Sequence, residues 1–394
     1  MHPVEEIRGE YSNKLKGKRI LLCITGSAAT VESFYICRDL VRHGADVIPV
    51  MSEASTRILH PDIMEFASGN KPVLSLTGKV EHVDLCGERG VDLVLVAPCT
   101  ANTISKMALG IADNAVTACV MTAKGSGIPI IIAPAMHLAL FRDPSVENNI
   151  NVLKKQGFII LGPRMEGNKA KLIAREEIVE NVIRTLGRND LNGKRILVIG
   201  GASAEGIDDI RVLTNRSSGR MGLELARAAF ERGGDVEYWH GWIKVSIPSY
   251  IRSRSFESVD DLLKMVESEN IDKFDVVIVC AALSNYVPRR FRGKISSMIK
   301  GLTIDLDIAP SVLERVRKIC KNARIVAFKA EEDAEKIADL ARDFLVKNDV
   351  HMVVANTLSS FGKDRSEFWI VTRKRILHKR GSKEEVANAI FDLL

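Results

Sequence analysis

A polar turn with small side chains, TNRSSGRMG, occupies residues 214–222. It follows the apolar run RILVIGG at loop distance and precedes LELARAAFERGG, whose apolar spacing is typical of an amphipathic helix, predicted over 218–232. The hydroxyl and backbone N–H groups of the turn would therefore meet a helix N-terminus, where a phosphate or another anion binds well. The residues that would present these groups are Ser217, Ser218 and Gly219.

Two segments of the first half also place small and polar residues after an apolar run. TGSAAT (25–30) would put free backbone N–H groups at the start of a helix, which suits a single phosphate. APCTANTISK (97–106) adds hydroxyl and amide side chains that could bind a polar heterocycle and its ribityl chain, as in flavin mononucleotide (FMN). Ser, Thr and Asn also cap helices routinely, so composition leaves a ligand site and ordinary caps as alternatives.

Other chemistry-bearing residues are scattered. His82 lies in a predicted helix, VEHVDLCG (80–87), and is either structural or catalytic, since histidine titrates near neutral pH. The seven cysteines form no C-x-x-C pair, which predicts reduced thiols rather than disulfides or a zinc site. Neither half contains G-x-G-x-x-G or G-x-x-x-x-G-K-[ST], so an ordinary NAD dehydrogenase or P-loop NTPase is unsupported.

The elements that must position these residues occur twice along the chain. LKGKRILLCITGSAA (15–29) and LNGKRILVIGGASAE (191–205) share an opening, a buried strand and a small-residue turn. Continuous apolar strands that alternate with helices predict parallel sheets covered on both faces. We therefore expect two doubly wound, Rossmann-like α/β domains, at 1–187 and 188–394. In such sheets ligands bind beyond the carboxyl ends of the strands, where the polar turns lie.

Composition places the chain among average soluble globular proteins. Of its 394 residues, 46% are apolar and 27% are charged, and no apolar run is long enough for a membrane span. The N-terminus is too polar for a signal peptide, so we expect a cytoplasmic protein. The dense basic run RKRILHKRGSK (373–383) favours a solvated hairpin over a nucleic-acid interface, because a nucleic-acid binder usually shows a more basic domain and a recognisable module.

The order of motifs resembles a known pair of enzyme families. In the first half, TGSAA, EHVDL, VLVAPCTANTISKMALGIADN and IIAPAMH resemble the flavin-containing cysteine decarboxylases, which include phosphopantothenoylcysteine decarboxylase. In the second half, GGASAEGIDDIRVLTNRSSGRMG, CAALSNY, GKI and VAFKAEE resemble phosphopantothenate–cysteine ligase. The resemblance covers residues 15–394 and implies an archaeal-type bifunctional enzyme of coenzyme A biosynthesis, with a flavodoxin-like flavoprotein domain followed by a CTP-dependent ligase domain.

For the first half, the resemblance implies FMN-dependent decarboxylation of 4'-phosphopantothenoylcysteine. FMN oxidises the cysteinyl thiol to a thioaldehyde, the carboxylate is lost as CO₂, and the flavin reduces the resulting enethiol. The resemblance assigns catalysis to His82 and substrate binding to Met136 and His137. The FMN contacts that it implies are Gly26, Ser27, Ala28, Ser52, Thr100, Ala101, Asn102, Thr103, Ser105 and Ala135.

For the second half, the resemblance implies that CTP with Mg²⁺ activates 4'-phosphopantothenate as an acyl-cytidylate, which cysteine then attacks. It assigns Asn215 to the acyl-cytidylate and Lys294 to the phosphates of the nucleotide, both as catalytic residues. It assigns no metal ligand. The CTP contacts that it implies are Gly201, Ser217, Ser218, Gly219, Ala281, Asn285, Lys294, Phe328 and Lys329.

Some positions depart from the pattern of bacterial relatives. His137 stands where those relatives have an Asn that binds the carboxylate, and it can still donate a hydrogen bond to that group. The flap GPRMEGNKAKLIAREE (162–177) has no cysteine, which leaves Lys169 or Lys171 as candidate proton donors. In the ligase half, Ser296 replaces a second lysine and Asn285 replaces Asp.

Two functions of other classes are alternatives. A two-domain nicotinamide oxidoreductase is disfavoured by the missing G-x-G-x-x-G, and a flavin-binding regulatory protein with a single active domain is disfavoured by the ligase-like half. The expected partners are the small molecules 4'-phosphopantothenate, L-cysteine and CTP, with neither nucleic acid nor membrane. The resemblance also implies a homo-oligomer, a dodecamer in which flavin-domain trimers are joined through ligase-domain dimers.

Overall fold

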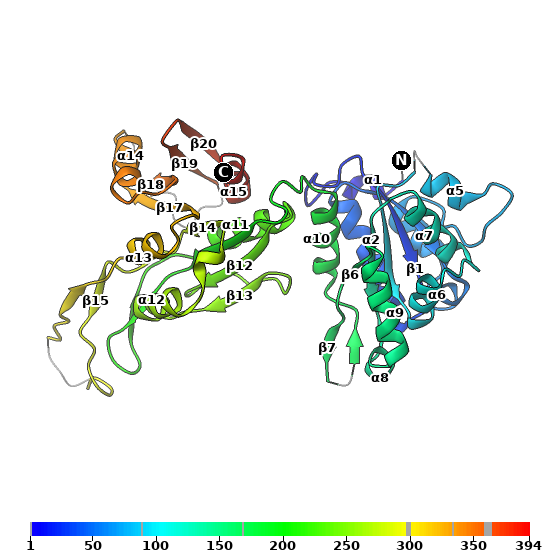
Figure 1. Cartoon of the computed structure of the whole chain (residues 1–394), viewed down its shortest axis with the longest axis horizontal. Helices are drawn as coiled ribbons and strands as arrows, with labels where there is room; N and C mark the ends of the chain where they lie inside the picture. Colours follow the sequence, from blue (N-terminus) through cyan, green and yellow to red (C-terminus); the bar gives the residue numbers. More distant parts are fainter. Residues whose placement is uncertain (1, 88–89, 168, 297–300, 333–334, 358–364) are drawn as a thin grey trace. The chain divides into compact units, whose positions relative to one another are not determined.

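The computed structural model describes residues 2–87, 90–167, 169–296, 301–332, 335–357 and 365–394 (Figure 1). The chain divides into two compact units, Met1–Arg188 and Asn189–Leu394, and each has its own sheet. All seven cysteines are free, as the sequence predicts. Among the described helices, none combines the length and the apolar character that a membrane crossing requires.

The sheet of the first unit has five parallel strands in the order β2-β1-β3-β4-β6. The strands are Arg19–Ile24 (β1), Asp46–Met51 (β2), Leu93–Cys99 (β3), Ile130–Pro134 (β4) and Ile159–Ile160 (β6). This is the flavodoxin-like order, in which the topology reverses between β1 and β3. The predicted doubly wound parallel sheet is confirmed in this unit.

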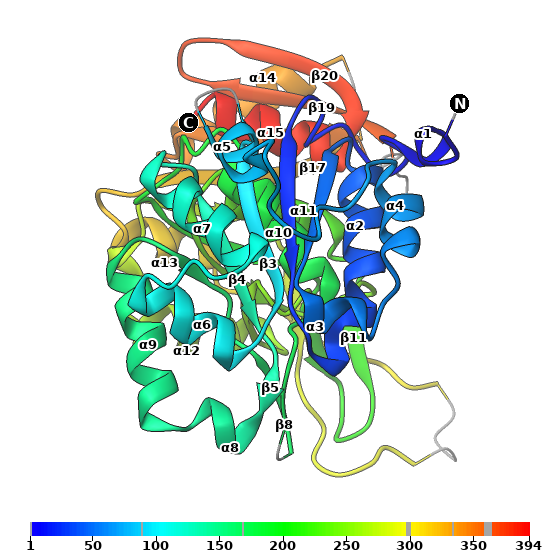
Figure 2. The same cartoon turned by 90° about the vertical axis from the view of Figure 1, so that its right-hand side faces the viewer.

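Helices cover both faces of this sheet because successive side chains of each strand point to opposite faces (Figure 2). Ile20, Leu22 and Ile24 of β1 pack with one set of helices, and Leu21 and Cys23 pack with the other. The first set is Val4–Ile7 (α1), Glu32–Arg42 (α2), Pro61–Ser68 (α4) and Arg175–Leu186 (α10). The second set is Glu81–Cys86 (α5), Ala101–Leu109 (α6), Ala115–Gly125 (α7) and Pro144–Lys155 (α9).

The flap of the first unit is a small antiparallel sheet in the order β5-β8-β7. It consists of Met136–His137 (β5), Lys169–Lys171 (β8) and Arg164–Glu166 (β7). Because β8 pairs with β5, the flap lies directly beside the two predicted substrate contacts. The remaining short helices are Ala28–Val31 (η1), Glu53–Thr56 (α3) and Leu138–Phe141 (α8).

The second unit has an eight-stranded sheet in the order β13-β12-β9-β14-β17-β18-β19-β20. The first six strands in this order are parallel and follow the Rossmann order, which reverses between β9 and β14. Their ranges are Arg252–Ser255 (β13), Asp235–His240 (β12), Arg195–Gly200 (β9), Val276–Val279 (β14), Arg324–Glu331 (β17) and Met352–Thr357 (β18).

The last two strands, Arg365–Thr372 (β19) and Ile376–Ser382 (β20), are antiparallel to their neighbours. The sheet is therefore mixed at this edge, and β20 with the turn before it forms the hairpin that the basic run at 373–383 favours. A short turn joins β19 to β20, and such a connection permits only antiparallel pairing of these two strands. Two further hairpins pair Ala204–Gly206 (β10) with Val212–Thr214 (β11), and Tyr286–Pro288 (β15) with Leu306–Ile308 (β16).

Helices again cover both faces of the second sheet. Ile196 and Val198 of β9 pack with Arg220–Glu231 (α11) and Lys383–Asp392 (α15). Leu197 and Ile199 pack with Val259–Ser268 (α12), Val312–Ile319 (α13) and Ile337–Lys347 (α14), and Ile271–Lys273 (η2) lies on the same side. Helix α11 begins later than the predicted 218, because Gly219 is its N-cap in the left-handed backbone conformation.

A buried arginine joins the two ends of the second unit. Arg232 follows α11 and donates from Nε to Asp190 Oδ1 at 3.0 Å, just before β9. Its Nη1 donates to Asp392 Oδ1 at 2.8 Å and to the carbonyl oxygen of Asn388 at 3.0 Å, both in α15. The guanidinium is almost fully buried, while both carboxylates are about half exposed. If one of these bonds breaks, water can replace the partner of a carboxylate but not that of the arginine, so the unpaired arginine accounts for most of the cost in free energy.

Replacing Arg232 should therefore destabilise the second unit. The Arg232→Met change keeps the apolar stem and removes the donors, and we expect it to lower the free energy of unfolding by about 2–3 kcal/mol. Urea unfolding of the full chain, followed by circular dichroism, measures the change. Arg252→Met, at an exposed ion pair with Asp235, is the matched control and should cost less than about 1 kcal/mol. Equal losses of unfolding free energy in the two variants would contradict a special role of the buried Arg232 contacts.

Candidate active sites

Four loops of the first unit meet at the carboxyl ends of β1, β2, β3 and β4. The N–H of Ser52 donates to the carbonyl of the last residue of β1 at 3.0 Å, and the N–H of Ala135 donates to the last residue of β3 at 3.0 Å. The hydroxyl of Thr25 donates to the carbonyl of Pro98 at 2.8 Å and accepts from the N–H of Thr100 at 3.0 Å. The loops that carry the predicted FMN contacts are therefore hydrogen-bonded to one another.

The turn after β1 has little freedom. A Cβ atom at Gly26 would lie 2.5 Å from Cβ of Ala54 in α3, so this position accepts no side chain without a shift. The Oγ of Ser27 accepts from the N–H of Ala29 at 3.3 Å, and Thr30 Oγ1 accepts from the N–H of Ser27 at 3.1 Å. Ser27 thus caps η1 and holds the turn close against α3.

A cavity of about 870 Å³ opens beside this turn. Its volume falls in the range of small-molecule sites. The turn contributes Ser27 and Ala28, and the segment after β4 contributes Ala135, Met136 and His137. Three predicted FMN contacts and both predicted substrate contacts therefore share one cavity. Three residues of the flap strands β7 and β8, Arg164, Ala170 and Lys171, also line it, whereas the side chain of Lys169 lies outside what the structure describes.

His137 is oriented by the helix that follows it. Its Nδ1 accepts from the N–H of Ala139 at 3.3 Å, so His137 is the N-cap of α8. In the neutral imidazole the proton must then be on Nε2, which is free to donate. The exposed ring, at the wall of the cavity, can therefore offer a hydrogen bond to a carboxylate there.

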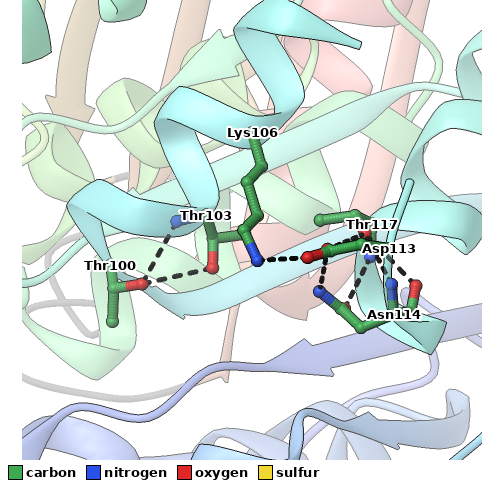
Figure 3. Close-up of polar contacts among 6 residues, drawn as sticks. All are labelled: Thr100, Thr103, Lys106, Asp113, Asn114 and Thr117. Carbon is green, nitrogen blue, oxygen red and sulfur yellow. Dashed lines mark hydrogen bonds and ion pairs between the residues drawn. The ribbon is translucent and has the colours of Figure 1, made fainter. Parts of the chain in front are cut away.

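The hydroxyl groups of α6 are engaged as caps (Figure 3). Thr100 Oγ1 accepts from the N–H of Thr103 at 3.3 Å and lies 3.1 Å from its hydroxyl oxygen. Figure 3 also shows Lys106, which donates to Asp113 at 2.5 Å and thereby lowers the pKa of that carboxyl, and Asn114, which caps α7. The hydrogen bonds of Thr100 and Asn114 are thus those of helix caps, which the sequence left open as the alternative to a ligand site.

The other predicted contacts on this side are near the loops but outside the cavity wall. Ser105 accepts a hydrogen bond from Asn149 of α9 at 3.0 Å, and Ser52 caps α3. Ala101 is buried, whereas Asn102 is exposed in the first turn of α6. These positions lie among the joined loops, and none of them lines the 870 Å³ cavity with His137.

His82 also lies outside that cavity. It belongs to α5, which packs against α7, and its Nδ1 is buried without a hydrogen-bond partner among the described residues. Buried polar atoms are nearly always bonded, so each exception needs an explanation. A substrate group brought next to α5 would supply the missing bond.

The second unit has a cavity of about 170 Å³ at the switch point between β9 and β14. The predicted CTP contacts that line it are Gly201, Ser217, Ser218, Gly219, Ala281, Phe328 and Lys329. A Cβ atom at Gly219 would lie 2.3 Å from Cγ2 of Ile243, and its φ of +72° favours glycine as well. This glycine therefore places the turn at the N-terminus of α11.

The polar turn is hydrogen-bonded to the segment that follows β14. Asn215 Oδ1 accepts from the N–H of Ser217 at 3.0 Å, and its Nδ2 donates to the carbonyl of Ala282, which follows β14. Lys329 pairs with Glu331 at 2.7 Å on the other side of the cavity. The amide of Asn215 is thus placed beside the predicted nucleotide contacts, although Asn215 does not itself line the cavity.

Sequence reasoning missed some residues of this cavity. Asn356 stands at the end of β18, in the segment 355–362 that the rule about strand ends indicates, although the resemblance assigns it no contact. Phe368 and Lys383 come from β19 and the start of α15, and that rule does not cover either element. Arg220 and Cys280, which adjoin predicted contacts, also line it.

Lys294 and Asn285 do not line the nucleotide cavity, and both are exposed. Lys294 precedes Ile295, whose N–H donates to Asp208 Oδ2 at 3.0 Å. The same buried carboxylate accepts from the N–H groups of Ile210 at 2.8 Å and Arg211 at 2.6 Å, and from the Arg211 guanidinium at 2.6 Å. The Ile295 N–H, the two neighbouring N–H groups and the Arg211 charge hold the pKa of Asp208 well below its usual range.

No group of three or more His, Cys, Asp or Glu side chains suited to a metal ion is present in the described ranges. The structure therefore adds no residue to the prediction on Mg²⁺.

Comparison with known proteins decides the family. The first unit matches the Flavoprotein family over residues 8–187, and the second matches the DNA/pantothenate metabolism flavoprotein C-terminal domain over 191–394. The whole chain is 43% identical to the coenzyme A biosynthesis bifunctional protein CoaBC of Thermococcus kodakarensis and covers 98% of it. The chain belongs to the CoaBC family. The CoaBC protein of Methanocaldococcus jannaschii is 36% identical over the full chain and 97% of that relative.

The family membership confirms the resemblance seen in the sequence. The chain is a bifunctional enzyme of coenzyme A biosynthesis, with a flavoprotein decarboxylase unit and a ligase unit. Among solved structures, the C-terminal domain of a CoaBC protein matches 52% of this chain and 95% of that domain, at 26% identity and a TM-score of 0.45.

The Asp208 anchor makes a prediction that depends on pH. A carboxyl whose folded pKa is depressed stabilises the fold above its unfolded pKa of about 4, and this contribution is lost as pH falls through the folded value. Asp208→Asn should therefore accelerate amide exchange at Ile295 by about tenfold or more at pH 7, because the amide group cannot accept from all these donors. The difference from wild type should shrink only below about pH 4.

Hydrogen–deuterium exchange of the full chain at several pH values measures this effect. Asp209→Asn is the matched control, since that neighbouring carboxylate makes an exposed ion pair with Arg290 at 2.9 Å. Unchanged exchange at Ile295 in the Asp208 variant would show that the loop before β16 is held by other contacts.

Proposed function

We propose that the second unit joins 4'-phosphopantothenate to cysteine with CTP, and that the first unit then decarboxylates the product with FMN to 4'-phosphopantetheine. The observation that carries this proposal is a cavity in each unit at the strand ends beside its switch point, lined by the residues that the family motifs single out. Ligands of open α/β sheets bind at such points, and in flavodoxin-like sheets FMN binds between β1 and β3.

The first unit fits a flavin on structural grounds. The close approach of Gly26 to α3 and the Ser27 cap form a side-chain-poor cradle at the end of β1, and the cavity beside it has room for an organic ligand. Bound FMN would accept electrons from the substrate thiol and return them after CO₂ is lost. The residues that would hold it are those of the joined loops 25–30, 97–106 and 133–137.

His137 and His82 would have separate roles in decarboxylation, the first in binding the substrate and the second in proton transfer. The Nε2–H of His137 would hold the substrate carboxylate at the cavity wall, because the α8 cap fixes its Nδ1 as an acceptor. The buried, unpartnered Nδ1 of His82 would exchange a proton with the reacting thiol. The flap, with Lys171 at the cavity wall, would cover the substrate and exclude water.

We infer that neighbouring copies complete the decarboxylase site. His82 does not line the cavity of its own unit, so a second copy would have to bring the two together. Exposed apolar residues near α5 and α6 support such a contact: Val80, Val83, Leu109 and Ile111. Sedimentation that shows only monomers under assay conditions would contradict this oligomer.

The two histidines make distinguishable predictions. His82→Asn should abolish CO₂ release while the chain retains FMN, because the side chain is assigned to the thiol and not to the flavin. His137→Asn keeps both a helix cap and a donor and should retain much of the activity, whereas His137→Ala should raise the barrier by about 1.5–3 kcal/mol. CO₂ release and the flavin spectrum measure both effects. Wild-type rates in the His137→Ala variant would show that His137 does not hold the carboxylate.

The second unit has groups that suit the phosphates and base of a nucleotide at its cavity of about 170 Å³. The hydroxyl and N–H groups of Ser217, Ser218 and Gly219 at the start of α11 would bind phosphates, and Phe328 and Lys329 would lie near the base. Mg²⁺ would be held by the phosphate oxygens of CTP, which are ligands that it prefers. Asn215 would contact the acyl-cytidylate, and Lys294 would reach the phosphates from the loop anchored by Asp208.

Asn215→Ala and Lys294→Ala should impair the ligase in different ways. Lys294→Ala should raise the KM for CTP by about tenfold and reduce formation of the acyl-cytidylate, because one charge contact to the nucleotide is lost. Asn215→Ala should leave CTP binding nearly unchanged and alter the amount of acyl-cytidylate that can be trapped. Pyrophosphate release and trapping of labelled cytidylate separate these effects. Arg292→Ala, on the same exposed loop as Lys294, is the control, and near wild-type behaviour of all three variants would show that the assignments are misplaced.

A further inference from the structure

The amino edge of the second sheet contains a basic cavity of about 690 Å³. Its walls come from α13, from the residues that start β17 and precede β18, from the turn between β19 and β20, and from Leu393 and Leu394 after α15. From Arg324, at the start of β17, to Lys329, in the nucleotide cavity, the strand rises about 16 Å. The cationic side chains in the basic cavity are Arg317, Lys321, Arg324, Arg373, Lys374 and Arg375.

Little of this positive charge is balanced. Among the described residues of the cavity wall, the acidic groups are the side chain of Asp349, which pairs with Arg373 at 2.6 Å and with Arg317 at 3.7 Å, and the terminal carboxylate of Leu394. Within the part of the chain that the structure describes, the other four cations of the cavity form no ion pair. A concave surface lined by one sign of charge concentrates counter-ions of the opposite sign. The cavity should therefore attract anions.

One guanidinium lacks an acceptor. Arg317 donates from Nη2 to the carbonyl of Lys321 at 2.6 Å, but its Nη1 is buried and has no partner among the described residues. A buried donor without an acceptor is costly, and a bound ligand oxygen would satisfy it. This atom is a second sign of a ligand, independent of the surplus of charge.

The pKa of a histidine in the cavity wall is affected by the same positive charges. Nδ1 of His351 accepts from the N–H of Ile325 at 3.2 Å, so the neutral ring carries its proton on Nε2. Burial and the nearby charges of Arg317 and Arg324 lower the pKa of His351. The ring is thus a further neutral donor at the wall of the basic cavity.

We propose that this cavity is a binding site for a small phosphorylated anion, separate from both active sites. A guanidinium group can donate two parallel hydrogen bonds to two oxygens of one phosphate. Arg317 lies in α13, and Arg373 and Arg375 lie in the β19–β20 turn, so one phosphorylated anion would bridge the helix and the turn. The cavity volume is that of a small-molecule site, whereas nucleic-acid surfaces are extended and carry aromatic side chains for base stacking. Apart from His351, the basic cavity has no aromatic residue on its wall among those described.

Calorimetric titration of the full chain with inorganic tripolyphosphate, at about 50 mM salt, tests the site. The double variant Arg373→Gln/Arg375→Gln should weaken tripolyphosphate binding by about tenfold or more, because two charge-assisted contacts are lost. Arg380→Gln, an exposed residue of the same hairpin outside the cavity, is the matched control and should bind as wild type does. Any binding at the nucleotide cavity is equal in all variants and cancels in the comparison.

The test also covers failure of the double variant to fold. Arg317→Lys keeps the charge and removes the planar fork with its unpartnered Nη1, so it should weaken binding on its own. The ligase rate should be unchanged in each variant, since none of these residues lines the nucleotide cavity. Tripolyphosphate binding equal to wild type in every folded variant would overturn the proposal. So would binding of duplex DNA or anionic vesicles through these arginines without any binding of tripolyphosphate at about 1 mM.

Discussion

The loops that form most of the two candidate active sites depend on one constraint: the carboxyl ends of parallel strands lie at the same edge of the sheet. In the first unit, the buried hydroxyl of Thr25 makes this edge rigid, since it donates to Pro98 and accepts from Thr100. It thereby fixes the turn after β1 against the loop after β3, across the switch point. The Ser27 turn and His137 line the same cavity beside this edge.

The same constraint explains what the sequence could predict. Continuous apolar strands alternating with helices predicted both sheets, the small and polar residues at strand ends indicated the turns that contain Ser27 and Ser217, and the family resemblance implied Ala135. Phe368 could not be found in this way, because an antiparallel strand brings it to the cavity from the opposite direction. Asp208 could not be found either, since its role depends on Ile295, a residue 87 positions away in sequence.

Helix capping and a place in a cavity wall are compatible in this structure rather than alternatives. Ser27 caps η1 and also lines the cavity, and His137 caps α8 in the same way while its Nε2 stays free to donate. A cap of this kind stabilises by about 1 kcal/mol and fixes the rotamer of the side chain that makes it. Composition cannot separate the two roles, because one polar side chain at a strand end can cap a helix and line a cavity at the same time.

The basic run at 373–383 is a second case in which the local sequence predicts an element but not the cavity that the element helps to form. As a hairpin with exposed charges it has the structure that its composition favours, yet a linear pattern cannot reveal concavity. The concavity arises because α13 and the start of β17 bring Arg317 and Arg324 to the same edge as Arg373. In most doubly wound units the amino edge carries no ligand, since the switch point opens at the other edge. Here an antiparallel hairpin added to the parallel strands places its turn at that edge, and this topology is what creates a second polar cavity.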